Sequence, residues 1–149
     1  TKMNSMFANT GHDSMKSLSL GKGFDTSLVE EMNYMFANTG FANMTKLNLG
    51  DNFNTSSVTT MNSMFLSTGH NSMTSLDLRD KFYTTSVTDM TNMFNGTGTV
   101  SMTTLDLGAV FTKIANNHEG MFTDCGKSNL VIYAPELIYS NETSFKLGR

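Results

Sequence analysis

Thirteen methionines in a chain of 149 residues raise the question of soft-metal chemistry. They accompany phenylalanine in a phrase that occurs four times, as MNSMFANTG (3–11), MNYMFANTG (32–40), MNSMFLSTG (61–69) and MTNMFNGTG (90–98). Thioether sulfur is a ligand for Cu(I), but methionine also fills irregular gaps in a protein core. No histidine or cysteine recurs with the methionines, whereas phenylalanine and leucine do. We therefore expect the methionines to form a core, and we predict no metal site.

Two aspartates could bring a pair of carboxylates together. Asp77 and Asp106 occupy the same position in neighbouring copies of the repeat described below. Such a pair can perform acid–base chemistry or hold Ca²⁺. However, Ser19 and Asn48 fill this position in the other copies. A solvated polar face explains all four residues, so we favour that interpretation over a chemical site.

The histidines and the cysteine offer the remaining reactive groups. His12 and His70 share a position but lie two copies apart. That separation is about 10 Å at the usual strand spacing, too far for one Zn²⁺ with bonds of about 2 Å. Cys125 and His118 could act as nucleophile and base, but no third residue is identifiable that would orient them. We expect surface-turn histidines and a half-buried cysteine, and we predict no catalytic residue and no cofactor.

All these residues belong to an internal repeat with a period of 29 residues. The Met-Phe pair begins at residues 6, 35, 64, 93 and 121, so the successive steps are 29, 29, 29 and 28 residues. The same period relates the leucines Leu18, Leu47, Leu76 and Leu105, and the phenylalanines Phe24, Phe53, Phe82 and Phe111. One such unit cannot bury its apolar side alone, so neighbouring units must stack.

Each unit is expected to contain one strand and one short helix. In the copy MTSLDLRDKFYTTSVTDMTNMFNGTG (73–98), the opening matches the apolar skeleton L-x-x-L-x-L of a leucine-rich repeat. Leu76 and Leu78 alternate with Asp77, which predicts a strand with its leucines pointing inward. A Thr/Ser cluster then suits a helix N-cap, apolar residues recur at helical spacing, and a Thr-Gly pair suits the C-cap.

The sequence thus predicts an α/β fold, a leucine-rich-repeat-like right-handed solenoid of about 4.5 coils of 29 residues, with a parallel sheet on one side and short helices on the other. The solenoid domain is expected at 1–126, with coils at 3–31, 32–60, 61–89 and 90–117 and a partial coil at 118–126. Residues 127–149 leave the repeat, contain the only proline and are expected to form a C-terminal cap. Because Thr1 precedes a helix that lacks its strand, we expect further repeats or domains N-terminal to it.

Composition narrows the possible partners. Ten basic and thirteen acidic residues give a net charge of −3, and no Lys/Arg cluster occurs, so we predict no nucleic-acid binding. No apolar run has the length of a membrane span, so we predict no membrane insertion of this segment. The single cysteine allows no internal disulfide.

The segments FDTSLVEEMNYMF (24–36), FNTSSVTTMNSMF (53–65) and FYTTSVTDMTNMF (82–94) resemble the BspA-like leucine-rich repeats of bacterial surface proteins, including the short DTS-VTDM-MF repeats of lactic-acid-bacterium and mycoplasma surface proteins. The resemblance covers about residues 3–126, although the unit here is longer. The cysteine that often follows Met-Phe in the family is present only as Cys125. The resemblance implies a leucine-rich-repeat-like solenoid, a secreted or wall-attached bacterial parent protein, and binding to host or neighbouring-cell ligands. It carries over no catalytic residue.

The outward strand face is the predicted binding surface, since repeat proteins often bind partners on such a face. Its candidate residues are Lys46, Asn48, Ser75, Asp77, Arg79, Thr104 and Asp106. Only Arg79 among them is of a type enriched in protein hot spots. Tyr34, Phe41 and Tyr83 lie off the core positions and are further anchor candidates.

We therefore expect a non-catalytic, extracellular or cell wall-attached bacterial module that binds a protein or glycan ligand on a cell surface or matrix. The alternative is a structural spacer, or stalk domain, of a larger surface protein with no ligand of its own. A stalk needs regular stacking and a bland surface, and both features are present. An enzyme would need polar clusters that break the repeat, and none is seen.

Overall fold

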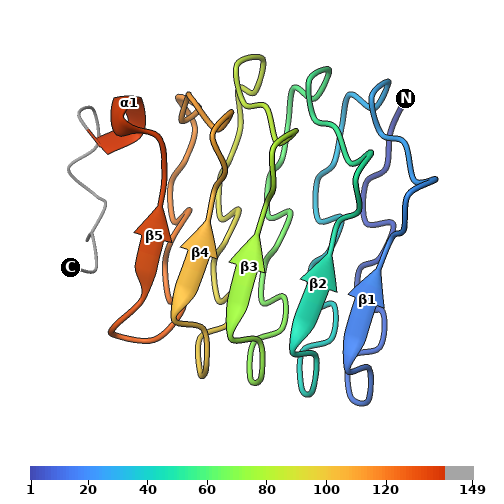
Figure 1. Ribbon diagram of the computed structural model, residues 1–149, viewed down its shortest axis with the longest axis vertical. Helices are drawn as coiled ribbons and strands as arrows, with labels where there is room; N and C mark the ends of the chain where they lie inside the picture. The colour runs from blue at the N-terminus through green and yellow to red at the C-terminus, as the bar shows by residue number, and fades with distance from the viewer. Residues whose placement is uncertain (140–149) are drawn as a thin grey trace.

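The computed structural model describes residues 1–139 of the chain (Figure 1). Five short strands follow one another, β1 (Ser17–Ser19), β2 (Lys46–Asn48), β3 (Ser75–Asp77), β4 (Thr104–Asp106) and β5 (Val131–Tyr133), before a single helical turn, α1 (Glu136–Tyr139). Figure 1 shows the strands side by side and in one direction, each joined to the next by a coil of chain. The result is a solenoid-like stack with one strand in each coil, so the predicted parallel, repeating arrangement is confirmed.

The core lies between the strands and the Met-Phe segments, as the sequence predicted. Met35, Met64 and Met93 are 0% exposed, and Leu76 and Leu105 point inward from β3 and β4. Each fully buried apolar side chain of this size stabilises the fold by roughly 1.5–3 kcal/mol. Ten of the thirteen methionines are therefore core residues, Met3 and Met15 pack against the core, and Met6 in the first coil is 50% exposed.

One phenylalanine from each coil joins a continuous ring stack inside the core. Phe36 and Phe65 lie with ring centroids 5.4 Å apart and planes within 4°, and Phe65 and Phe94 repeat that geometry at 5.4 Å and 3°. Phe7 and Phe122 extend the stack at its two ends. The 29-residue period therefore places identical side chains directly above one another.

The predicted short helices were wrong, because the Met-Phe segments form a chain of tight turns. A helix requires each N–H to bond the carbonyl four residues earlier. Here alternate amides leave the coil: the Tyr34 and Phe36 N–H groups donate to carbonyls of the next coil at 2.9 and 2.8 Å. The amides that alternate with them close four-residue turns, as from Met35 N–H to the Met32 carbonyl at 3.3 Å and from Ala37 N–H to the Tyr34 carbonyl at 3.1 Å. In the described residues, α1 is the only α-helix.

Residues with positive φ make this turn chain possible. In the second coil they are Tyr34 (φ 57°) and Asn38 (φ 55°). The equivalent residues of the other coils are Ser5 and Asn9, Ser63 and Ser67, Asn92 and Gly96, and Gly120 and Asp124, all with positive φ. A left-handed residue every fourth position cannot belong to an α-helix.

The threonines expected to cap helices hold neighbouring coils together instead. Thr26 and Thr55 are buried, and their hydroxyls donate to the carbonyls of Asn54 and Tyr83 in the next coil at 2.9 and 2.6 Å. In the Thr-Gly position, the Thr68 hydroxyl donates back to Phe36 O at 2.7 Å. These buried hydroxyls thus satisfy backbone carbonyls between coils.

The sheet consists of two parts rather than one. A two-stranded sheet pairs β1 with β2, and a three-stranded sheet has the order β3-β4-β5. Within the second part the register aligns Asp77 with Asp106, and Thr104 with Val131. β5 and α1 fall in the segment predicted as a cap (127–149), of which residues 140–149 lie outside the described part of the chain. In residues 1–139, no helix has the length and apolar character that a bilayer crossing requires.

Candidate functional site

The structure places the seven candidate residues on the outer face of β2–β4 and the turn after β3. Lys46, Ser75, Asp77 and Arg79 are exposed, whereas Asn48, Thr104 and Asp106 are half-buried. The strand leucines point the opposite way, into the core, because successive side chains of a strand alternate between its two faces. The strand register brings Asp77 beside Asp106.

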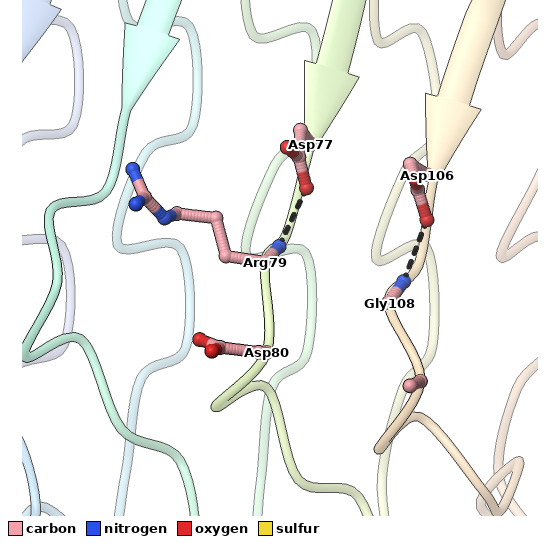
Figure 2. A pocket seen from close by; sticks show the side chains of 6 residues that line it. Asp77, Arg79, Asp80, Asp106 and Gly108 are labelled. Atoms are coloured by element: carbon pink, nitrogen blue, oxygen red, sulfur yellow. Dashed lines mark hydrogen bonds between the residues drawn. The ribbon is translucent and has the colours of Figure 1, made fainter.

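The residue that ends each of β2, β3 and β4 closes a tight turn with its own side chain. Asp77 Oδ1 accepts the Arg79 N–H at 2.7 Å, and Asp106 Oδ1 accepts the Gly108 N–H at 2.9 Å, as Figure 2 shows. The Asn48 side chain makes the equivalent contact without a charge, because its Oδ1 accepts the Gly50 N–H at 3.0 Å. Such Asx turns are a structural use of these side chains. No group of three metal-binding side chains occurs in residues 1–139.

A shallow depression of about 480 Å³ lies beside these turns, lined by Asp77, Arg79, Asp80, Asp106, Gly108 and Ala109 (Figure 2). The Arg79 side chain runs away from Asp106 and toward β2. Its Nη1 donates to Asn48 Oδ1 at 3.0 Å, and its Nη2 pairs with Asp51 Oδ1 at 2.8 Å. Lys81 Nζ follows the same direction and donates to the Asp51 carbonyl at 2.8 Å. Two cations of the third coil therefore reach across to the second.

These cations cross a seam, the boundary between β2 and β3 where the strand ladder is interrupted. Between β3 and β4, the Leu78 N–H donates to the Asp106 carbonyl at 2.9 Å. The equivalent bond from Leu49 to Asp77 is missing, and no ladder joins β2 to β3 in the described chain. The seam therefore lies directly under Arg79.

The side chain of Arg79 itself explains the seam. Its position in the repeat is glycine in the neighbouring coils, and all of these residues have positive φ. A Cβ added to Gly50 would lie 2.1 Å from the Gly21 carbonyl oxygen, and one added to Gly108 would lie 2.0 Å from that of Arg79. Arg79 carries a Cβ at this position, so the third coil cannot approach the second as closely. We attribute the missing ladder to this contact.

Arg79 also has a backbone conformation that costs energy. Its φ is 67°, and a left-handed residue with a Cβ is disfavoured by roughly 1–2 kcal/mol. The sequence identified Arg79 as the anchor-type residue of this face but did not predict the seam. The available signal was an arginine where three other coils have glycine.

The two histidines of the surface turns are parts of an aromatic stack. The ring of Phe41 lies between those of His12 and His70, with centroid distances of 4.9 and 4.6 Å. His12 Nδ1 contacts Asp13 Oδ1 at 2.6 Å, and His70 Nδ1 contacts Asn71 Oδ1 at 2.8 Å. The intervening ring keeps the imidazoles two coils apart, which agrees with their predicted role as surface-turn residues.

Cys125 has the opposite of a nucleophile's environment. Its side chain is half-buried, and burial raises the pKa of the thiol to about 12. A catalytic cysteine needs a lowered pKa, because the thiolate is the reactive form. His118 Nδ1 lies 2.7 Å from the Ala115 carbonyl. The half-buried position of Cys125 agrees with the sequence-based prediction.

Comparison with known proteins identifies the family but no detailed precedent. A family model described as "Mycoplasma protein of unknown function, DUF285" matches residues 1–134. No curated protein and no solved structure matches the chain. The match agrees with the predicted resemblance at the level of a repeat family, and it does not distinguish the BspA-like leucine-rich repeats within it. From its first coil to the end of β5, the chain belongs to the DUF285 family.

Proposed function

We propose that this chain is a non-catalytic interaction module of a secreted or wall-attached bacterial surface protein. In this proposal it binds a protein or glycan of a host or neighbouring cell through the outer face of β2–β4. As part of this proposal, the chain belongs to the BspA-like class of leucine-rich repeats. Its coils are also proposed to wind in the right-handed sense, which connections between parallel strands favour. The observation that carries it is the conformation and exposure of Arg79.

Arg79 has features of a residue kept for contact rather than for stability. Its left-handed backbone is unfavourable and its Cβ interrupts the sheet, yet its side chain remains 40% exposed. Backbone strain of this kind concentrates at functional sites. Arginine is also enriched among the residues that dominate binding energy at protein interfaces. The bonds to Asn48 and Asp51 hold the guanidinium in one orientation, which lowers the entropy lost on binding.

The repeat itself supplies a sharp test. In a triple variant, Lys46→Ser, Asp77→Ser and Arg79→Gly, each new residue is the one that another coil has at the same position. The fold should therefore tolerate all three changes. The immobilised chain is screened against fibronectin, laminin, collagen and a glycan panel by surface plasmon resonance. We expect a ligand that the triple variant binds at least tenfold more weakly.

A matched control changes an exposed residue elsewhere in the repeat. Leu28 is 78% exposed, and the next coil has serine at its position, so Leu28→Ser should leave binding unchanged. Equal binding by the triple variant and the native chain would exclude the outer face of β2–β4 as the site.

The spacer function is favoured by a different observation. The phenylalanine stack runs through five coils with centroid distances of 5.4–5.5 Å, as expected of a uniform rod. A spacer predicts that the isolated chain binds nothing in the screen. It also predicts that a parent surface protein keeps its ligand binding after deletion of residues 1–149.

A further inference from the structure

The side of the stack opposite the strands has a different chemical character. Residues 4–9, 33–38, 62–67 and 91–96 form the turn chain there, and none of them is charged. Apart from Met6, which is 50% exposed, their methionine and phenylalanine side chains pack in or against the core, while the others are mainly asparagine, serine and alanine. We call this surface the amide strip. The outer face of β2–β4, in contrast, carries Lys46, Asp77 and Arg79.

One aromatic residue interrupts the strip. Tyr34 is 45% exposed and has a φ of 57°. Its position is held by Ser5, Ser63 and Asn92 in the other coils, with nearly the same φ. A bulky residue in the left-handed region is an outlier, whereas asparagine tolerates that region. Because the ring remains exposed, burial gives little compensation for the unfavourable conformation.

Amide groups of the strip lie within one turn of Tyr34 along the chain and in the preceding coil. Asn38 Nδ2 donates to Asn9 Oδ1 at 3.2 Å. This bond leaves the Asn9 amide donors and the Asn38 carbonyl oxygen available to a ligand. The same positions recur at the coil spacing, which the 5.4 Å between the Phe7 and Phe36 rings measures. The next two coils have Ser67 and Gly96 at this position, so a ligand that lies along the stack would meet the amide pair beside Tyr34, in the first two coils.

We propose that the amide strip around Tyr34 binds a neutral, linear glycan. A sugar ring presents an apolar face that can pack on an aromatic ring, and its hydroxyls match neutral amide donors and acceptors. The strip itself carries no charge, and the carboxylates at its edge, Glu31 and Asp89, accept from its Asn4 and Asn62 amides, which disfavours an anionic ligand. This inference goes beyond the proposed function, because it assigns a ligand class to a second face of the molecule, separate from the outer face of β2–β4.

The test compares two tyrosines by titration calorimetry with cellohexaose and chitohexaose as neutral probes. Tyr34→Asn introduces the residue of the fourth coil, Asn92. We expect it to weaken binding at least tenfold and to leave the melting temperature unchanged or higher. Tyr133→Asn is the matched control, because Tyr133 is 55% exposed on β5 and Asn48 holds the equivalent strand position on β2. It should bind the probe as the native chain does.

Several results would overturn the proposal. These are no binding of either probe by the native chain, native-like binding by Tyr34→Asn, or a lower melting temperature for Tyr34→Asn, which would make Tyr34 a packing residue. Loss of a protein ligand rather than a glycan in Tyr34→Asn would mark the strip as a protein contact. Including the strand-face triple variant in the same assay separates the two proposals, because it should bind the neutral hexaose probe as the native chain does. If the triple variant keeps every ligand found in the screen while Tyr34→Asn loses the hexaose, the strand-face site fails and the amide strip stands.

Discussion

The boundaries β2/β3 and β3/β4 join equivalent coils of one repeat, yet only the second has a continuous strand ladder. Beneath both boundaries the core is the same, since the Phe36–Phe65 and Phe65–Phe94 distances are both 5.4 Å. One Cβ, that of Arg79, therefore changes the strand side while the turn side keeps its spacing. The comparison teaches that the two sides of a coil are only loosely coupled.

Side chains partly replace the bonds lost at the seam. The amide bonds missing there are those expected from Leu49 to Asp77 and from Thr74 to Thr45, by comparison with Thr103 to Thr74 at 3.0 Å. Arg79 and Lys81 instead reach across to the second coil. Exposed ion pairs are worth only about 0–1 kcal/mol, so we expect the seam to be the weakest boundary on the strand side.

The largest expected effect tests whether the core is continuous beneath the seam. Met64→Asp places an unpaired charge where the native side chain is 0% exposed, and we expect it to cost more than about 4 kcal/mol. Thermal melting followed by circular dichroism should show the whole chain unfolded. Unchanged melting would contradict the core assignment. A surviving transition from one side of the seam alone would show that the seam divides two independent units.

A second seam should appear if a Cβ is added at the β3/β4 boundary. Gly108→Ala brings a methyl group to within about 2.0 Å of the Arg79 carbonyl, at a φ of 77°. We expect a loss of roughly 2–3 kcal/mol and faster hydrogen exchange of the Leu78 amide, which donates across this boundary. Gly23→Ala is the control, because no atom lies within 4 Å of its added Cβ. Equal stability of the two variants would reject the steric explanation.

Removing the Cβ at the seam should close it. In Arg79→Gly we expect the Leu49 amide to gain protection from hydrogen exchange as β2 and β3 pair. The free energy of unfolding should change by less than about 1 kcal/mol, because relief of the left-handed conformation opposes loss of the Asp51 ion pair. Exchange of Leu49 as fast as in the native chain would show that another contact holds the coils apart.

The smallest effect concerns a polar contact on the turn side, where the boundaries are alike. Asp89 is partly buried, which opposes its ionisation, but hydrogen bonds from Thr91 and Asn62 outweigh burial and lower its pKa below the usual 3.8. A lowered folded-state pKa contributes stability above the unfolded pKa, and this is lost as pH falls through the folded value. Asp89→Asn introduces the residue that the next coil has at the paired position, Asn117. It should reduce the loss of unfolding free energy at low pH by less than about 1 kcal/mol. Urea unfolding at pH 7 and at pH 2.5 measures it, and identical pH dependence would contradict the assignment.

Sequence periodicity predicted the stacking, the inward leucines and the methionine core because these depend only on which residues recur. It did not distinguish a helix from a chain of turns, since apolar residues spaced as Met32, Met35 and Phe36 fit either structure. The distinguishing signal was the recurrence of asparagine, serine and glycine at the positions of Asn38 and Tyr34. The seam was beyond the pattern, because the contact at Arg79 depends on where a carbonyl of another coil lies.

The alternating amides of the turn chain have a consequence for how such a chain can change in length. Every coil offers its neighbour the same donors and acceptors, so removing or duplicating a whole 29-residue unit presents each remaining coil with an equivalent partner. The step of 28 residues between Met93 and Met121 shows that the connection can also shorten by one, since Phe94 still donates to the Met121 carbonyl at 2.8 Å. Gain or loss of whole repeat units therefore changes the length of the stack without creating a new kind of boundary between coils.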